Sequence, residues 1–124
     1  MAHYTAHSRS SAARWGGEPH EYDHLHRWMD ETKGWFPGPA HRALRHHTMG
    51  VWEAERIFGS QIQLSTGKLV PVTYVLEQHI IEDLGFLATP QDWLKHLTVP
   101  PDMKSRGPAE PMSVDMGSLP PKNI

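Results

Sequence analysis

The chain has 124 residues and contains no cysteine. This absence excludes disulfide bonds, thiolate catalysis and thiolate zinc sites, so histidine, aspartate and glutamate are the only strong metal ligands available. No apolar run approaches the roughly 18 residues that a membrane helix requires, and the first residues lack the apolar segment of a secretory signal. We therefore expect no membrane partner, and a cytoplasmic protein or, if a phage encodes it, a virion-associated one.

Several signatures of catalysis and nucleotide binding are also missing. The chain has no glycine-rich phosphate loop, no dinucleotide fingerprint and no nucleophile elbow. Charge of one sign is not in excess, because 12 basic residues face 14 acidic ones and the formal net charge is −2 with histidine neutral. This balance gives no indication of nucleic-acid binding. With 38% apolar residues, a chain of this length forms about one domain with a modest core.

Hydrophobic spacing predicts a mainly α-helical fold, a compact bundle of about four to five helices with one small β-hairpin. Glycines and prolines mark most of the expected boundaries. The predicted helices cover about residues 8–15, 19–34 and 39–59, then a stretch capped by Thr73 that ends at Leu84, and a short last helix opened by a capping box at residues 89–92. The predicted hairpin pairs residues 61–64 with residues 68–70.

The composition changes sharply between residues 1–99 and residues 100–124. The second stretch holds six of the 11 prolines and no aromatic residue. Such a segment cannot bury enough apolar surface to fold by itself. We expect a single His-rich domain over residues 1–99 and an extended Pro-rich arm over residues 100–124. Met103, Met112 and Met116 are adaptable apolar side chains, and we expect them to contact neighbouring protein subunits.

Ten histidines are the most distinctive residues of the chain. His47 lies where two apolar rows of the predicted long helix cross, and His79 lies on the apolar face of the helix that ends at Leu84. A buried imidazole needs partners for both ring nitrogens, and these must come from other segments. Glu82 and Asp83 follow His79 by three and four residues, so one carboxylate could orient the ring while the other reaches a shared ion.

Two interpretations of these residues stay open. In the first, histidines from several helices converge with carboxylates on one divalent ion, either zinc, iron or manganese. The candidate ligands are His26, His41, His46, His47, His79, Glu82 and Asp83. In the second, the buried histidines are neutral and act as polar staples of the core. The structural polar residues of that core are Asp30, Arg42, Glu53 and Glu77.

Two local motifs have ordinary explanations beside the functional ones. Residues 20–24, HEYDH, match the metalloprotease pattern H-E-x-x-H, but too few residues precede them for the sheet that normally supports such a zinc site. We interpret them as a solvated helix start. Arg42 and Arg45 stand near another helix start and could bind a phosphate. We favour their pairing with acidic residues of the same chain.

Five stretches lie in order over about residues 12–94: RWGGEPHEY, LHRWMDETK, HRALRHHTMGVWEAERIFG, GKLVPVTYVLEQHIIEDLG and TPQDWL. This arrangement resembles a family of small, uncharacterised, His-rich proteins of bacteria and tailed phages, catalogued as a domain of unknown function. The resemblance implies no established reaction. The positions that match the family's pattern are His26, Trp28, Asp30, His41, Arg42, His46, His47, Gly50, Glu77, His79, Glu82 and Asp83.

We therefore hypothesise a non-catalytic accessory or structural subunit of a larger, phage-related assembly, with protein subunits as partners and a homo-oligomer as one form. The second hypothesis is a metal-dependent hydrolase or nuclease. Its candidate residues are His26, His41, His47 and His79 with Asp83 or Glu82. A third, a small inhibitor of a host protein, fits the size but has no residue that points to it. An enclosed histidine cluster favours the subunit, and an open pocket around the histidines favours the hydrolase.

Overall fold

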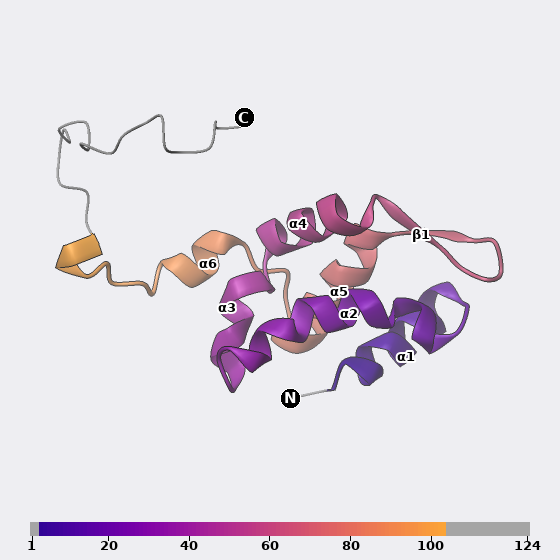
Figure 1. Cartoon of the computed structure of the whole chain (residues 1–124), viewed down its shortest axis with the longest axis horizontal. Helices are drawn as coiled ribbons and strands as arrows, with labels where there is room; N and C mark the ends of the chain where they lie inside the picture. Colours follow the sequence, from indigo (N-terminus) through magenta and orange to yellow (C-terminus); the bar gives the residue numbers. More distant parts are fainter. Residues whose placement is uncertain (1–2, 104–124) are drawn as a thin grey trace, which may run out of the picture.

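A computed structural model describes residues 3–103 and shows a mainly helical domain with one small antiparallel hairpin, which confirms the predicted fold class (Figure 1). The helices and strands are α1 Tyr4–Trp15, α2 Asp23–Asp30, α3 Arg42–Arg45, α4 Thr48–Phe58, β1 Gln61–Gln63, β2 Leu69–Pro71, α5 Val72–Leu84 and α6 Pro90–Leu94. Short 3-10 turns cover Pro19–Tyr22, Glu31–Gly34, Pro39–His41 and Pro101–Met103. Within the described range, no helix combines the length and the apolar character that crossing a bilayer requires.

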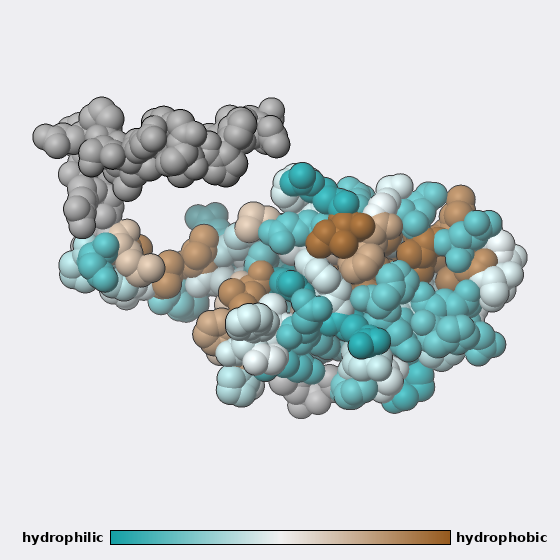
Figure 2. Space-filling model, in the orientation of Figure 1, coloured by the Kyte–Doolittle hydropathy of each residue, from teal (hydrophilic) through white to brown (hydrophobic). Residues whose placement is uncertain are grey.

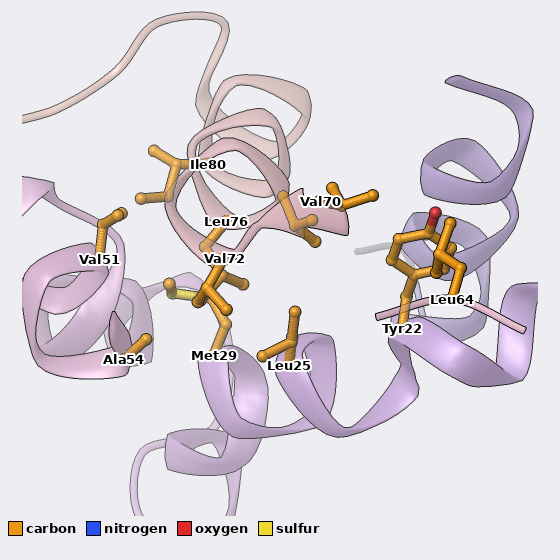
Figure 3. Close-up of a cluster of buried hydrophobic side chains, with 11 residues drawn as sticks. Tyr22, Leu25, Met29, Val51, Ala54, Leu64, Val70, Val72, Leu76 and Ile80 are labelled. Carbon is orange, nitrogen blue, oxygen red and sulfur yellow. The ribbon is translucent and has the colours of Figure 1, made fainter. Parts of the chain in front are cut away.

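Helix α5 is the central element of the domain and packs against α1, α2 and α4. Its buried residues recur every three or four positions, which places them on one face of the helix. Figure 3 shows this face meeting side chains from α2, α4 and the hairpin. The apolar core consists of Tyr22, Leu25, Met29, Val51, Ala54, Leu64, Val70, Val72, Val75, Leu76 and Ile80. Burial of each valine, leucine, isoleucine or methionine side chain contributes about 1.5–3 kcal/mol, so the core is the main source of stability.

The predicted hairpin is present. Strands β1 and β2 pair antiparallel with Ile62 opposite Val70, and the Leu64 N–H donates to the Lys68 carbonyl at 2.8 Å to close the turn. Val70 is fully buried, which attaches the hairpin to the helical core. The strand leads directly into α5, and this explains one wrong prediction. The helix begins at Val72 with Pro71 as its N-cap, so Thr73 is not the cap residue.

Helix α1 begins one turn earlier than predicted. It starts at Tyr4, not at about residue 8, because His3 caps it: the His3 Nδ1 accepts a hydrogen bond from the Thr5 N–H at 3.3 Å. The added turn carries His7, which is buried together with Ser8 and Ser11 on the inner side of the helix. A polar face is therefore turned toward the centre of the molecule.

The predicted long helix over residues 39–59 is wrong, because the chain bends at His46 and His47. Helix α3 ends at Arg45, and His47 adopts an extended conformation as the N-cap of α4. The His47 Nδ1 accepts a hydrogen bond from the Gly50 N–H at 3.1 Å. His47 therefore does not lie at the centre of a helical face, and Leu44 of the predicted apolar row is exposed.

The bend requires glycine at position 50. A Cβ atom built on Gly50 would lie 1.9 Å from the carbonyl oxygen of Arg45, a backbone atom of the preceding helix. That separation is far below van der Waals contact, so α3 and α4 meet at this angle only because residue 50 has no side chain.

Helix α6 begins as predicted. The Thr89 side chain accepts from the Asp92 N–H at 3.3 Å, and the Asp92 carboxylate accepts from the Thr89 N–H at 2.8 Å, which forms the expected capping box. The described chain ends at Met103, whose side chain is exposed. Met112 and Met116 lie outside the described residues, and the predicted division after residue 99 stays a prediction.

The close approach at Gly50 gives a first prediction. Gly50→Ala should lower the free energy of unfolding by about 1–3 kcal/mol, because the added methyl group must push the two helices apart. Gly34→Ala is the matched control, since a Cβ there meets nothing within 4 Å. Urea denaturation of the three proteins measures the effect. Equal midpoints for Gly50→Ala and the wild type would contradict this account of the bend.

Candidate metal centre

Two histidines and two aspartates lie close together where α2, the start of α4 and α5 meet. They are Asp30 at the end of α2, His46 at the bend before α4, and His79 with Asp83 on α5. One ligand atom from each residue lies within 4.8 Å of the other three. All four side chains are at most 8% exposed. These are the residue types, and the proximity, that a buried divalent cation requires.

Nitrogen and oxygen atoms alternate around this site. The His46 Nε2 lies 2.9 Å from the Asp83 Oδ2 and 3.4 Å from the Asp30 Oδ1. The His79 Nε2 lies 3.2 Å and 3.3 Å from the same two oxygens. A tetrahedral ion with ligand distances of about 2.0–2.1 Å would separate its ligand atoms by about 3.3–3.4 Å. The four nitrogen–oxygen separations of 2.9–3.4 Å are close to this value.

Local sequence explains how each ligand reaches the site. His79 and Asp83 are four residues apart on α5, so they project from the same face one turn apart. The bend between α3 and α4 turns His46 inward, and its backbone carbonyl accepts a hydrogen bond from the Trp93 Nε1 at 2.9 Å. Asp30 ends α2, beside the core residue Met29. The site thus joins three separate segments.

Both aspartates are ionised. Burial alone would raise the pKa of Asp30, but hydrogen bonds from His46 and His79 outweigh it and hold that pKa well below its usual value. The pKa of Asp83 is lowered against the same effect of burial by hydrogen bonds from His46, His7 and His79. Two carboxylates in the ionised form are ready to bind a cation, and their charge balances that of one divalent ion.

A chain of hydrogen bonds leads from the site toward α1. The His79 Nδ1 lies 2.8 Å from the His26 Nδ1, and the His26 Nε2 lies 2.8 Å from the Ser11 Oγ. Burial and the neighbouring imidazoles of His79 and His7 lower the pKa of His26 to about 2, so His26 is neutral. If the His79 Nδ1–H donates a hydrogen bond to the His26 Nδ1, the His79 Nε2, which faces Asp30 and Asp83, would be the nitrogen left to bind an ion in place of its present contacts with the two carboxylates.

His7 lies on the other side of Asp83. Its Nδ1 is 2.8 Å from Glu82 and its Nε2 is 3.1 Å from the Asp83 Oδ1, and its ring stacks on His79 at 3.7 Å. Burial lowers the pKa of His7, but hydrogen bonds and charges from Asp83 and Glu82 outweigh it and raise the pKa overall. Arg42 adds a positive group, 3.7 Å from the Asp83 Oδ1. These contacts hold Asp83 in place from outside the ligand group.

The structure brings together three of the predicted metal candidates, His46, His79 and Asp83. His26 lies next to them and contacts His79, but it is not one of the four residues whose ligand atoms converge. The remaining candidates lie elsewhere. The His41 Nδ1 is 2.9 Å from the Thr32 hydroxyl, the His47 ring caps α4, and Glu82 pairs with His7.

Asp30 was predicted as a structural polar residue; it is buried, and its Oδ1 also belongs to the candidate ligand group. Arg42 approaches Asp83 as a structural partner. Glu53 and Glu77 are half-buried and line surface pockets on α4 and α5 rather than the core. The sequence reasoning missed His7 and Ser11. Their four-residue spacing would have indicated an inward polar face if α1 had been extended to Tyr4.

The two local motifs have structural roles. His20 and His24 are exposed. Glu21 accepts a hydrogen bond from the Ser65 N–H at 2.6 Å, which holds the hairpin turn against the segment before α2. Arg42 and Arg45 pair with Asp83 and Glu31 of the same chain, which confirms the interpretation that we favoured. The Arg45 Nη1 lies 3.3 Å from the Glu31 carboxylate.

Comparisons with known proteins identify the family. The family described as a domain of unknown function (DUF6915) matches residues 2–103, and the chain belongs to this family. No curated protein and no solved structure matches the chain.

The contacts of His7 give a second prediction. His7→Gln should lower the free energy of unfolding by about 1.5–3 kcal/mol, because a hydrogen bond to Glu82 and an ion pair with Asp83 are lost inside the protein. His20→Gln, at an exposed histidine, is the matched control. Urea denaturation in the presence of a chelator separates this effect from metal binding. A His7→Gln protein with the midpoint of the control would show that His7 does not support Asp83.

Proposed function

We propose that this chain is a non-catalytic structural subunit whose fold is fixed by one divalent metal ion bound to Asp30, His46, His79 and Asp83. The observation that carries the proposal is the alternating arrangement of two imidazole nitrogens and two carboxylate oxygens, 2.9–3.4 Å apart. These residues come from three segments of the chain. An ion at their centre would therefore tie α2, α4 and α5 together.

Enclosure of the site supports a structural role over a hydrolytic one. Structural zinc sites have four protein ligands, whereas catalytic sites keep one position open for water or substrate. Here four protein ligand atoms lie within 4.8 Å of one another, and the side chains of His46 and His79 are fully buried. The competing hydrolase or nuclease would need an open position at the ion, and His41 and His47, two of its predicted residues, lie outside the ligand group.

Zinc fits this ligand set best among the three candidate metals. Zn²⁺ accepts four nitrogen and oxygen ligands in a tetrahedron, while iron and manganese sites commonly add water or substrate positions. Two ionised aspartates carry a charge of −2, and an imidazole that binds zinc through a ring nitrogen adds none, so one Zn²⁺ would neutralise the group. A neutral complex avoids the large cost of burying an unbalanced charge.

The assembly role is the second part of the proposal. A small domain whose polar centre is enclosed, followed by a Pro-rich arm with apolar methionines, has the features of a subunit that binds neighbouring proteins through its arm. The resemblance to proteins of tailed phages extends the proposal to a phage-related particle.

Native mass spectrometry of the full-length protein tests the metal site. We expect one Zn²⁺ per chain after addition of one equivalent, and stabilisation of the fold by about 2.7 kcal/mol when free zinc exceeds its dissociation constant 100-fold. Asp83→Asn and His46→Gln should abolish stoichiometric binding, and His20→Gln should leave it intact. Circular dichroism of the metal-free variants checks that they fold.

The wild-type protein by itself can refute the metal site, even if the ligand variants fail to fold. Absence of zinc in the wild type at one equivalent, or loss of zinc in His20→Gln, would contradict the proposed ligands. Stoichiometric zinc that resists mild chelation, with no change in the unfolding midpoint, would contradict its structural role.

The hydrogen bonds behind His79 give a further prediction. Ser11→Ala and His26→Gln should weaken zinc binding by about 10–100-fold, because the His79 ring then loses the hydrogen bonds that fix its orientation. Ser8→Ala is the matched control, since Ser8 is a buried serine of the same helix that bonds to Asp23 instead. Competition with a colorimetric chelator measures affinity, and Co²⁺ absorption reports the geometry. Equal affinities in all four proteins would show that His26 does not position His79.

A further inference from the structure

An apolar groove lies between α6 and the α3–α4 bend. It has a volume of about 430 Å³, and its lining includes Leu44, Met49, Trp93, Leu94 and Leu97. Apart from Trp93, these side chains are 47–61% exposed. Figure 2 shows hydrophobic surface around α6, at the end of the molecule where the described chain leaves the helices. A contiguous apolar surface of this kind marks a site that another segment covers.

The groove is attached firmly to the candidate metal centre. The Trp93 Nε1 donates to the backbone carbonyl of His46 at 2.9 Å, and the Thr48 N–H donates to the Ala88 carbonyl at 2.9 Å. α6 is therefore held beside the bend by two hydrogen bonds from separate segments. A groove fixed in this way is ready to receive a ligand without reorganisation.

Residues 104–124 carry a segment whose pattern suits the groove. Met112, Val114 and Met116 alternate with Ser113 and Asp115. On an extended backbone this period of two places the three apolar side chains on one side and the polar ones on the other. Methionine is flexible and fills irregular apolar spaces, as a groove lined by leucine, methionine and tryptophan requires.

The direction of the chain indicates whose groove is filled. After Leu97, residues 98–103 carry the chain away from the helices that form the groove, and the described chain ends at Met103 with its side chain exposed (Figure 1). Twenty-one residues follow Met103. A chain that leaves in this direction is placed to reach another molecule.

We propose that Met112, Val114 and Met116 of one copy dock in the groove formed by α6 and the α3–α4 bend of a second copy. This inference rests on the proposed assembly role and does not require a bound metal. The contact buries three apolar side chains, which is small for a stable protein interface. If two copies exchange arms, the same contact forms twice in one dimer. The second contact forms within the complex, so the two together bind more strongly than one alone.

Sedimentation of the full-length protein over a range of concentrations tests the interface. We expect concentration-dependent self-association, and a dissociation constant at least about tenfold higher in Leu94→Asp and Leu97→Asp, because a charge then faces the methionines. Ile57→Asp and Leu69→Asp are matched controls, since these exposed apolar residues lie away from the groove. A monomer at every concentration, or equal effects of all four substitutions, would overturn the proposal.

Photo-crosslinking identifies the occupant. A photoreactive residue at position 112 of an isotopically heavy copy, mixed with light protein, should crosslink to Trp93 or Leu94 of the light copy. Crosslinks confined to the same copy would show that the arm fills its own groove and would overturn the exchange. Crosslinks elsewhere would overturn the docking site. Zinc content measured on the same samples keeps this outcome separate from the metal proposal, because either can fail alone.

Discussion

Burial of Asp30 and Asp83 is the constraint on which the rest of this structure depends. An ionised carboxylate inside a protein is costly unless cations or hydrogen-bond donors surround it. His46 and His79 each face both carboxylates, His7 and Arg42 approach Asp83, and Lys33 lies 3.7 Å from Asp30. Moving any of the three segments that supply these groups would leave a buried charge without its partners.

This constraint explains features of the fold that the apolar core does not. The core requires only that α2, α4, α5 and the hairpin pack together. The polar centre additionally requires the chain to bend at His46, and the bend in turn requires Gly50. α1 adds His7 and Ser11 to the same region. A metal ion at the centre would replace several partial interactions by one set of four bonds.

The sequence predicted elements whose signals are local. The hairpin, the end of α5 at Gly85 and the capping box of α6 depend on turn residues and caps within a few positions of each other. The break between α3 and α4 could not be predicted in this way, because it depends on contact between Gly50 and a carbonyl of the preceding helix. A histidine as N-cap of α1 was equally hard to anticipate, since serine, threonine, aspartate and asparagine are the usual caps.

The sequence predicted the kinds of residue in the candidate site better than it predicted which residues form it. The spacing of His79 and Asp83 on one helix indicated a shared partner, and both are in the group. His47 was placed at the centre because the bend was missed, and its neighbour His46 occupies that position instead. Asp30 enters through the tertiary fold, and no spacing in the sequence relates it to residues some fifty positions away on α5.

Zinc K-edge X-ray absorption of the full-length protein, loaded with one equivalent of zinc, tests the account most directly. A closed structural site predicts four nitrogen or oxygen ligands at about 2.0 Å, with the scattering pattern of two imidazoles. Five or six ligands with fewer than two imidazoles, or a spectrum equal to that of hydrated zinc, would contradict a metal ion held by Asp30, His46, His79 and Asp83.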